Sequence, residues 1–187
     1  MGVGGLNPPS SADSNDQAPW PASGGGFSWD IARPSWQDKA VSAYLSNTKQ
    51  PGASAFNASG RAYPDVAVLA NDVPMVIGGQ SVVSGGTSAA APAMAGFLGL
   101  IVNARASSGK PNSGRLGLLP ALIYAQNEKA PGTLFSTPIN SGANSACASD
   151  GYCCPLDSSF LANDDFDVLT GLGRPIYNAW LSFLSGI

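Results

Sequence analysis

The 187-residue sequence predicts a fold that mixes strands and helices, because short β-branched runs and longer helical patterns both occur along the chain. A hydrophobic content of 44% is sufficient to build a buried core in a chain of this length. Glycine, proline and asparagine bound the runs, as is typical of strand ends and turns. No repeat and no internal boundary is evident, so residues 1–187 are expected to form one domain or a large part of one.

The first half of the chain predicts one helix and several short strands. Residues 1–26 are rich in Pro, Ser and Gly and predict a loop after a short strand at 1–3. Apolar residues recur at helical spacing over 36–45, with Ser35 as the expected cap and Asp38 placed as in a capping box. Three β-branched runs predict strands, of which the last two form a hairpin: 66–69, 75–77 and 81–83.

The second half predicts three helices separated by loops. Small and apolar residues continue over 88–104 without alternation, which predicts a helix that is buried on nearly all sides. Residues 115–127 predict another helix that is started or split by Pro120, and 174–187 predict a short amphipathic helix. The segment 132–164 has the composition of a loop throughout.

Charge and composition argue against two classes of partner. Charged residues make up 11% of the chain, with 9 basic against 12 acidic side chains and a pI near 4.6. This balance leaves no basic patch for nucleic acid or an anionic membrane, so neither partner is expected. The apolar run 89–104 is interrupted by Pro92 and two glycines, and we expect it to be too short to span a membrane. Few charges are also typical of proteins that work in acid.

Three cysteines lie together in a Ser, Asn and Gly-rich segment, and the chain has no histidine to complete a zinc site of mixed ligands. One local disulfide is therefore expected, which leaves one cysteine over. That cysteine is either bonded outside the chain or a buried free thiol. The three residues are Cys147, Cys153 and Cys154.

Ser88 stands among glycines and alanines at the start of the apolar helix, in the stretch VVSGGTSAAAPAMAGFLGLIVNA. A helix N-terminus offers unsatisfied backbone N–H groups and a positive dipole end, which suit an oxyanion. Gly85 and Gly86 permit a tight turn before the serine, and small alanines after it leave room for a substrate. The pattern alone allows two interpretations: a nucleophile, or a small residue in a tightly packed helix start.

Four motifs carry a resemblance to a known family. SGGTSAAAPAMAG, residues 84–96, resembles the nucleophile signature G-T-S-x-x-x-P that subtilisin-like proteases share with sedolisins, the serine-carboxyl peptidases. The other three resemble sedolisin segments and follow the family's order over nearly the whole chain: SGGGFSWDIARPSWQDKAVSAYL (23–45), GRAYPDVAVLA (60–70) and DVLTGLGRP (167–175). Residues 1–187 are thus similar to the C-terminal part of a sedolisin peptidase domain.

This resemblance implies both a fold and an activity. The implied fold is an α/β, subtilisin-like parallel sheet with helices on both faces, of which this chain forms the C-terminal portion. The implied activity is that of an acid-active serine-carboxyl endopeptidase or tripeptidyl peptidase, secreted or lysosomal/vacuolar, that hydrolyses peptides or proteins. Ser88 would be the catalytic nucleophile, and its backbone N–H would help to hold the oxyanion. A chain without histidine cannot form a Ser-His-Asp triad, whereas sedolisins activate their serine with a glutamate.

The chain departs from the family in lacking the serine's activators. In sedolisins the glutamate, its orienting aspartate and the oxyanion aspartate all precede the V-G-G that matches residues 3–5 here. Glu128 is the only glutamate, and it lies in a lysine-flanked helix end that is poorly suited to a general base. Two interpretations follow. Either an N-terminal partner chain of the same precursor completes a peptidase, with this chain inactive alone, or the protein is a non-catalytic binding or interaction module descended from sedolisins.

The resemblance also implies a calcium site near the C-terminus, with oxygen ligands as this cation prefers. Asp167 matches one family ligand and Ile139 another, but Pro138 stands where a second aspartate belongs. The family's G-x-G is replaced by the sequence Asn-Asp-Asp at 163–165. Asp167 and Ile139 are the expected ligands, and two outcomes stay open. Either the loss of one aspartate and both glycines abolishes the site, or the added Asp164 and Asp165 rebuild it.

Overall fold

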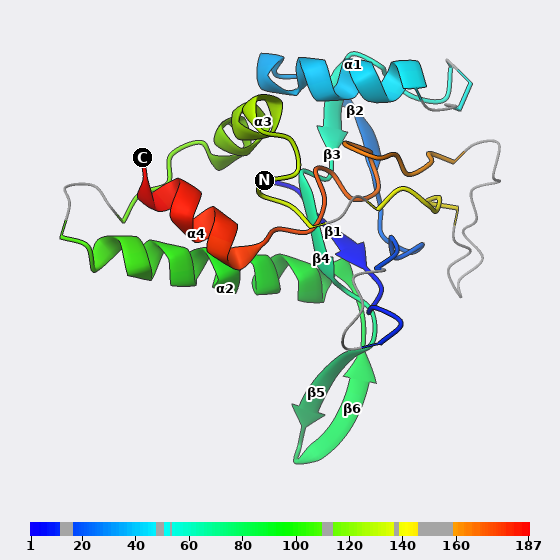
Figure 1. Ribbon diagram of the computed structural model, residues 1–187. Coiled ribbons are helices and arrows are strands. Elements are labelled where there is room, and N and C mark those ends of the chain that lie inside the picture. Colours follow the sequence, from blue (N-terminus) through cyan, green and yellow to red (C-terminus); the bar gives the residue numbers. More distant parts are fainter. Residues whose placement is uncertain (12–16, 48–50, 53, 110–113, 137–138, 146–158) are drawn as a thin grey trace.

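The computed structural model describes all residues except 12–16, 48–50, 53, 110–113, 137–138 and 146–158. The three cysteines, and with them the expected disulfide, lie outside the described residues. Strands and helices mix along the chain, as predicted (Figure 1). The elements in order are β1 (Val3–Leu6), β2 (Gly26–Ala32), η1 (Ser35–Gln37), α1 (Asp38–Asn47), β3 (Gly60–Tyr63), β4 (Val66–Leu69), β5 (Val73–Ile77), β6 (Gln80–Ser84), α2 (Thr87–Ala106), α3 (Leu119–Lys129) and α4 (Tyr177–Ser185).

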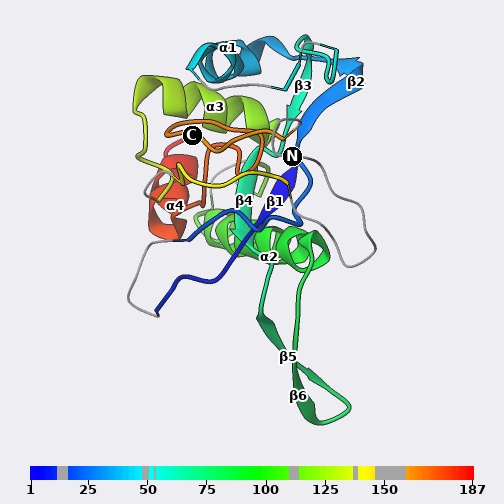
Figure 2. The ribbon, with the colours of Figure 1, turned by 90° about the vertical axis from the view of Figure 1, so that its right-hand side faces the viewer.

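A parallel pair of strands lies at the centre. β1 pairs with β4 in a register that runs from Val3 opposite Val66 to Leu6 opposite Leu69. Helix α2 packs against both strands, and α4 packs against α2. Figures 1 and 2 both place α2 below this pair and α1 and α3 above it, so helices lie on both sides of the strands. This is the α/β arrangement that the sequence predicted.

An aromatic core fills the space between the helices and the strand pair. Trp180 of α4 is fully buried and meets the rings of Phe97 and Phe135 edge-on, with centroids 5.5 and 5.9 Å away. Tyr44 of α1 and Phe166 form another edge-on pair at 6.1 Å. Such pairs add about 0.5–1.5 kcal/mol beyond the apolar area that they bury. The core therefore joins helices from both sides of the strand pair to one another.

The GRAYPD segment forms a buried ion pair. The Asp65 side chain is fully buried, and its Oδ2 accepts hydrogen bonds from Arg61 Nη2 at 2.8 Å and from the backbone N–H of Gly2 at 2.6 Å. The Arg61 guanidinium lies over the rings of Trp36 and Tyr63, 5.2 and 4.4 Å from their centroids. These contacts anchor the residues before β1 to the loop before β4, so the segment has a structural role.

A tight turn at Gly171 docks on the backbone of Asp65. Gly171 has φ +66°, and a Cβ at this position would overlap the backbone carbonyl of Asp65. The Leu172 N–H donates to the Asp65 carbonyl oxygen at 2.9 Å. Only glycine satisfies both the conformation and the close approach. This explains physically why glycine occupies the middle of the TGLG motif.

Two predictions about the first half are wrong in detail. The strand expected at 1–3 is β1 at Val3–Leu6, inside the segment expected to be a loop, and the antiparallel ribbon of β2 and β3 was not predicted. The ribbon depends on backbone pairing with a register shift, and most of β2 is exposed on both faces. The capping box at Ser35 is absent, because Asp38 Oδ1 accepts a hydrogen bond from Arg33 Nε at 2.8 Å. Charged donors compete well for a carboxylate.

Helix α2 is not buried on nearly all sides, contrary to the prediction. Its buried residues lie along one stripe: Ala90, Met94, Ile101 and Arg105. The opposite surface consists mainly of alanines and glycines and includes Leu100, which is 60% exposed. The physical reason is that the described residues pack against one side of the helix only.

The expectation that this segment is too short for a membrane span is also wrong on length. α2 has 20 residues, and within the described part of the chain it is the one helix long and apolar enough to cross a membrane. Core helices of globular proteins have the same length and composition.

Candidate active site

Ser88 is the second residue of α2 and is exposed. The turn before it is tied to the central strands, because the Gly86 N–H donates to the carbonyl oxygen of Ala70 at 2.7 Å. Ala70 directly follows β4, so Ser88 lies at the carboxyl end of the parallel pair. Open α/β sheets bind their ligands at this edge. The tertiary structure thus places the predicted nucleophile where such folds hold their substrates.

Glycine is required at Gly86, which has φ +147° and ψ +150°. This conformation begins α2 abruptly, with no side chain capping the first turn. The Gly86 carbonyl accepts from Ala89 and Ala90, at 2.8 and 3.4 Å. The N–H groups of Thr87 and Ser88 have no carbonyl inside the helix to bond, as in the first turn of any helix. These two donors, with the positive end of a 20-residue helix, suit an oxyanion beside the Ser88 hydroxyl.

Among the described residues, no carboxylate is hydrogen-bonded to Ser88. Glu128, the one glutamate of the chain, is engaged elsewhere. It lies in α3, and its Oε2 is 3.9 Å from Lys39 Nζ of α1 in an exposed ion pair. In Figure 1, α3, the helix of Glu128, lies above the central strands, and α2, the helix of Ser88, lies below them.

Two asparagines that the sequence analysis missed lie at the same edge as Ser88. Asn7 directly follows β1 and Asn71 closely follows β4, and Asn71 Nδ2 donates to Asn7 Oδ1 at 3.1 Å. The signal in the sequence is their position just after two paired strands, which only the strand pairing makes recognisable. Their amides add polar groups to the strand ends beside the Ser88 turn.

The β5–β6 hairpin projects from the body just before this turn (Figure 2). It contains no charged residue, and three of its apolar side chains are well exposed: Val76 at 74%, Ile77 at 62% and Val83 at 66%. An isolated two-stranded hairpin is only marginally stable in water. The hairpin therefore offers apolar surface for a contact close to Ser88 in the chain.

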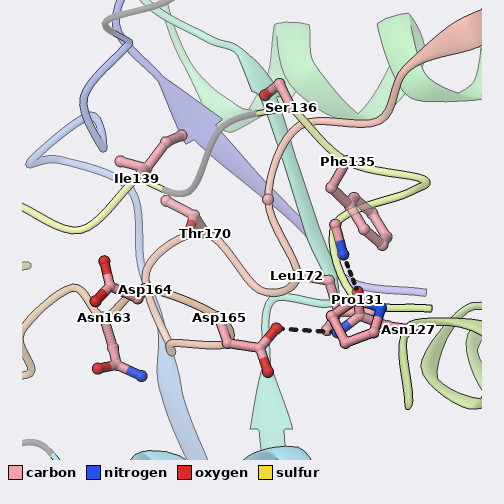
Figure 3. Close-up of a pocket in the computed structure, with 12 residues that line it drawn as sticks. Asn127, Pro131, Phe135, Ser136, Ile139, Asn163, Asp164, Asp165, Thr170 and Leu172 are labelled. Atoms are coloured by element: carbon pink, nitrogen blue, oxygen red, sulfur yellow. Dashed lines mark hydrogen bonds between the residues drawn. The ribbon is translucent and has the colours of Figure 1, made fainter. Parts of the chain in front are cut away.

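A separate cavity of about 430 Å³ lies between the end of α3 and the C-terminal loops (Figure 3). Ile139 lines this cavity together with Asn163, Asp164 and Asp165. The structure thus brings Ile139 close to the loop that holds Asp167. Among the described residues, no group of three acidic, His or Cys side chains is placed to hold a metal ion.

Asp167 is fully buried behind the cavity. Burial raises the pKa of its carboxyl group from 3.8 to about 6, because the charged form loses its hydration. Hydrogen bonds from Asn163, Thr170 and Leu169 favour the charged form and oppose this shift in part. The folded protein therefore binds this proton more tightly than the unfolded chain does.

We predict that the free energy of unfolding falls as the pH rises from about 4 to about 6, by up to about 3 kcal/mol. The contribution of Asp167 is fully present below its unfolded pKa of 3.8 and is lost as the pH rises through the folded value of about 6. Urea unfolding at a series of pH values measures this slope, and Asp167→Asn should flatten it. A variant that keeps the full slope would assign the titration to another group.

No protein-family model matches the sequence. Curated relatives do match: human tripeptidyl-peptidase 1 is 38% identical over 165 residues, and physarolisin of Physarum polycephalum is 35% identical over 162 residues. The matches cover 87% and 86% of this chain, but 27% of each relative, so the chain spans about a quarter of their length.

The fold is that of a serine-carboxyl proteinase. Pseudomonas sedolisin, solved with two molecules of pseudo-iodotyrostatin, superposes with a TM-score of 0.70 at 24% identity, over 98% of this chain and 45% of that protein. Together with the relatives, this confirms the predicted fold and family. The chain belongs to the sedolisin family of serine-carboxyl peptidases and corresponds to a part of the peptidase domain.

Proposed function

We propose that this chain is the nucleophile-bearing, C-terminal part of an acid-active serine-carboxyl peptidase that hydrolyses peptide bonds. The observation that carries the proposal is the placement of Ser88, exposed at the N-terminus of α2 and at the carboxyl end of β1 and β4. The relatives support it, since two of them are named as a tripeptidyl-peptidase and a serine-carboxyl proteinase.

The chemistry follows from the groups present. Ser88 Oγ attacks the scissile carbonyl carbon, and its proton passes to a carboxylate base. N–H groups in the first turn of α2 stabilise the oxyanion that forms. Collapse of this intermediate transfers the proton to the leaving amine and leaves an acyl-enzyme, which water then hydrolyses. A carboxyl base exchanges protons most effectively in acid, which agrees with a chain that contains no histidine.

We propose that the base comes from an N-terminal partner chain or segment of the same precursor. Two surfaces favour such a partner. The exposed side of α2 is lined with small residues, which permit close packing, and parallel sheets are normally covered on both faces and contain more than two strands. The length of the relatives is consistent with a further segment.

Native mass spectrometry at acid pH, on protein purified from its source, tests this assembly. We expect a complex heavier than 18.9 kDa by one defined N-terminal component, or a single longer chain that contains it. Either species should cleave peptides in acid. An 18.9 kDa species with no acid peptidase activity would contradict the proposal.

The second candidate is a non-catalytic binding module for a peptide, glycan or protein. One observation favours it: among the described residues, no carboxylate is hydrogen-bonded to Ser88. An inactive complex whose partner binding is unaffected by Ser88→Ala would support this candidate.

The relatives leave two cleavage modes to distinguish. Tripeptidyl release requires a free amino terminus on the substrate, whereas endopeptidase cleavage does not. Paired peptides with free and acetylated amino termini, analysed by mass spectrometry, separate the two modes. We propose a secreted or lysosomal/vacuolar location, which cell fractionation with the same acid assay tests.

A further inference from the structure

We propose that the two C-terminal loops, residues 139–145 and 159–167, are held together by an asparagine clasp and do not bind calcium. The clasp consists of two hydrogen bonds between the loops: Asn140 with the Asp164 side chain, and the Asn144 side chain with the backbone of Phe160. The inference is independent of the proposed peptidase activity, because it concerns stability and metal content.

The first argument is that protein donors already surround the Asp167 carboxylate. Oδ1 accepts from the Leu169 N–H at 2.8 Å, from the Thr170 N–H at 2.6 Å and from Thr170 Oγ1 at 3.1 Å. Oδ2 accepts from the Asn163 N–H at 3.0 Å. Three donors thus share the two lone-pair sites of Oδ1, and a fourth donor takes one of the two sites of Oδ2. N–H and O–H groups that point at both oxygens present positive charge where a cation would have to lie.

The second argument is that the added aspartates do not converge on one point. Asp164 Oδ1 accepts from Asn140 Nδ2 at 2.7 Å, and Asp165 Oδ1 accepts from Asn127 Nδ2 at 3.0 Å. Figure 3 shows the Asp165 carboxylate directed toward Asn127 and the Asp164 carboxylate directed away from it. Calcium takes 6–8 oxygen ligands around a single centre. These two side chains are therefore poorly placed to rebuild the family site.

The third argument is that the two loops are already joined directly. Asn144 Oδ1 accepts from the Phe160 N–H at 2.8 Å, and the Asn144 N–H donates to the Phe160 carbonyl at 3.2 Å. The Ala162 N–H donates to the Gly142 carbonyl at 3.0 Å. The Asn140–Asp164 hydrogen bond lies in the same interface. These bonds join the loops that an ion would otherwise bridge.

The direct test is thermal unfolding of the complete protein in excess EDTA and in millimolar calcium, with bound calcium measured by atomic emission. We expect the two Tm values to agree within about 1 °C and no stoichiometric calcium to be bound. A Tm that rises by about 5 °C or more in calcium, with one ion per chain, would overturn the proposal. If Asp164→Asn with Asp165→Asn then removed that rise, these two aspartates would have rebuilt the site.

The clasp itself is tested with Asn144→Ala, which removes the acceptor of the Phe160 N–H. We expect Tm to fall by about 3–8 °C, equally in calcium and in EDTA. Asn144→Asp keeps the acceptor and serves as the matched control, with a smaller fall. If the alanine variant does not fold, Asn140→Ala at the exposed end of the clasp provides the same comparison. Recovery of either alanine variant by calcium would show that an ion stabilises these loops.

Discussion

Ser88→Ala should abolish acid proteolysis by the complete enzyme, with kcat/KM lower by about 10,000-fold or more. Without the hydroxyl no acyl-enzyme can form, and alanine preserves the start of α2 because its helix propensity is high. Peptide binding should change little. The measurement is kcat/KM for a fluorogenic peptide at acid pH, together with the affinity of a non-cleavable peptide.

Ser81→Ala is the matched control for this substitution. Ser81 is an exposed serine on β6, paired with Val76 in the hairpin. Its replacement should leave kcat/KM unchanged within about twofold, as is usual for a surface substitution. Retained acid activity in the Ser88 variant would rule out Ser88 as the nucleophile.

Asp65→Asn should lower the free energy of unfolding by about 3–5 kcal/mol, the largest effect on stability that we expect. The substitution leaves the Arg61 guanidinium, whose side chain is 13% exposed, without its counter-charge. In either orientation the asparagine NH2 faces a donor: Gln37 Nε2, 3.5 Å from Oδ1, or the Arg61 and Gly2 donors at Oδ2. Urea unfolding monitored by tryptophan fluorescence measures the loss.

Asp38→Asn provides a control of the same chemistry in a different setting. Asp38 also bonds an arginine at 2.8 Å, but its side chain is 57% exposed. Water screens that pair, so its loss should cost less than about 1 kcal/mol. Equal effects at Asp38 and Asp65 would contradict the structural role assigned to the buried pair.

Local patterns in the sequence were sufficient for several elements. The runs at 66–69, 75–77 and 81–83 coincide with β4 or lie inside β5 and β6, because β-branched residues are enriched in strands and turn formers mark where each run ends. The terminal helix and the helix at Pro120 were found for a similar reason, since periodicity and proline act within a few residues. The placement of Ser88 at a helix start also needed only its neighbours.

Contacts between segments distant in sequence decided the features that local sequence patterns did not predict. The β2–β3 ribbon was missed because its pairing lies in the backbone and leaves no alternating pattern in the side chains. The partners of Asp65 include Gly2, which is 63 residues away, so the buried ion pair becomes visible only when the chain has folded.

Ser88, Asp167 and α2 show most clearly which features the sequence determines and which the tertiary structure determines. The sequence by itself determined which residue types stand there: a serine after two glycines, a carboxylate before a glycine turn, and a long apolar helix. Only the tertiary structure decided that Ser88 lies at the carboxyl end of a parallel pair, that four donors surround Asp167, and that one side of α2 is open. The physical reason is that burial and hydrogen-bond partners depend on segments distant in sequence, whereas helix and turn preferences depend on the nearest residues.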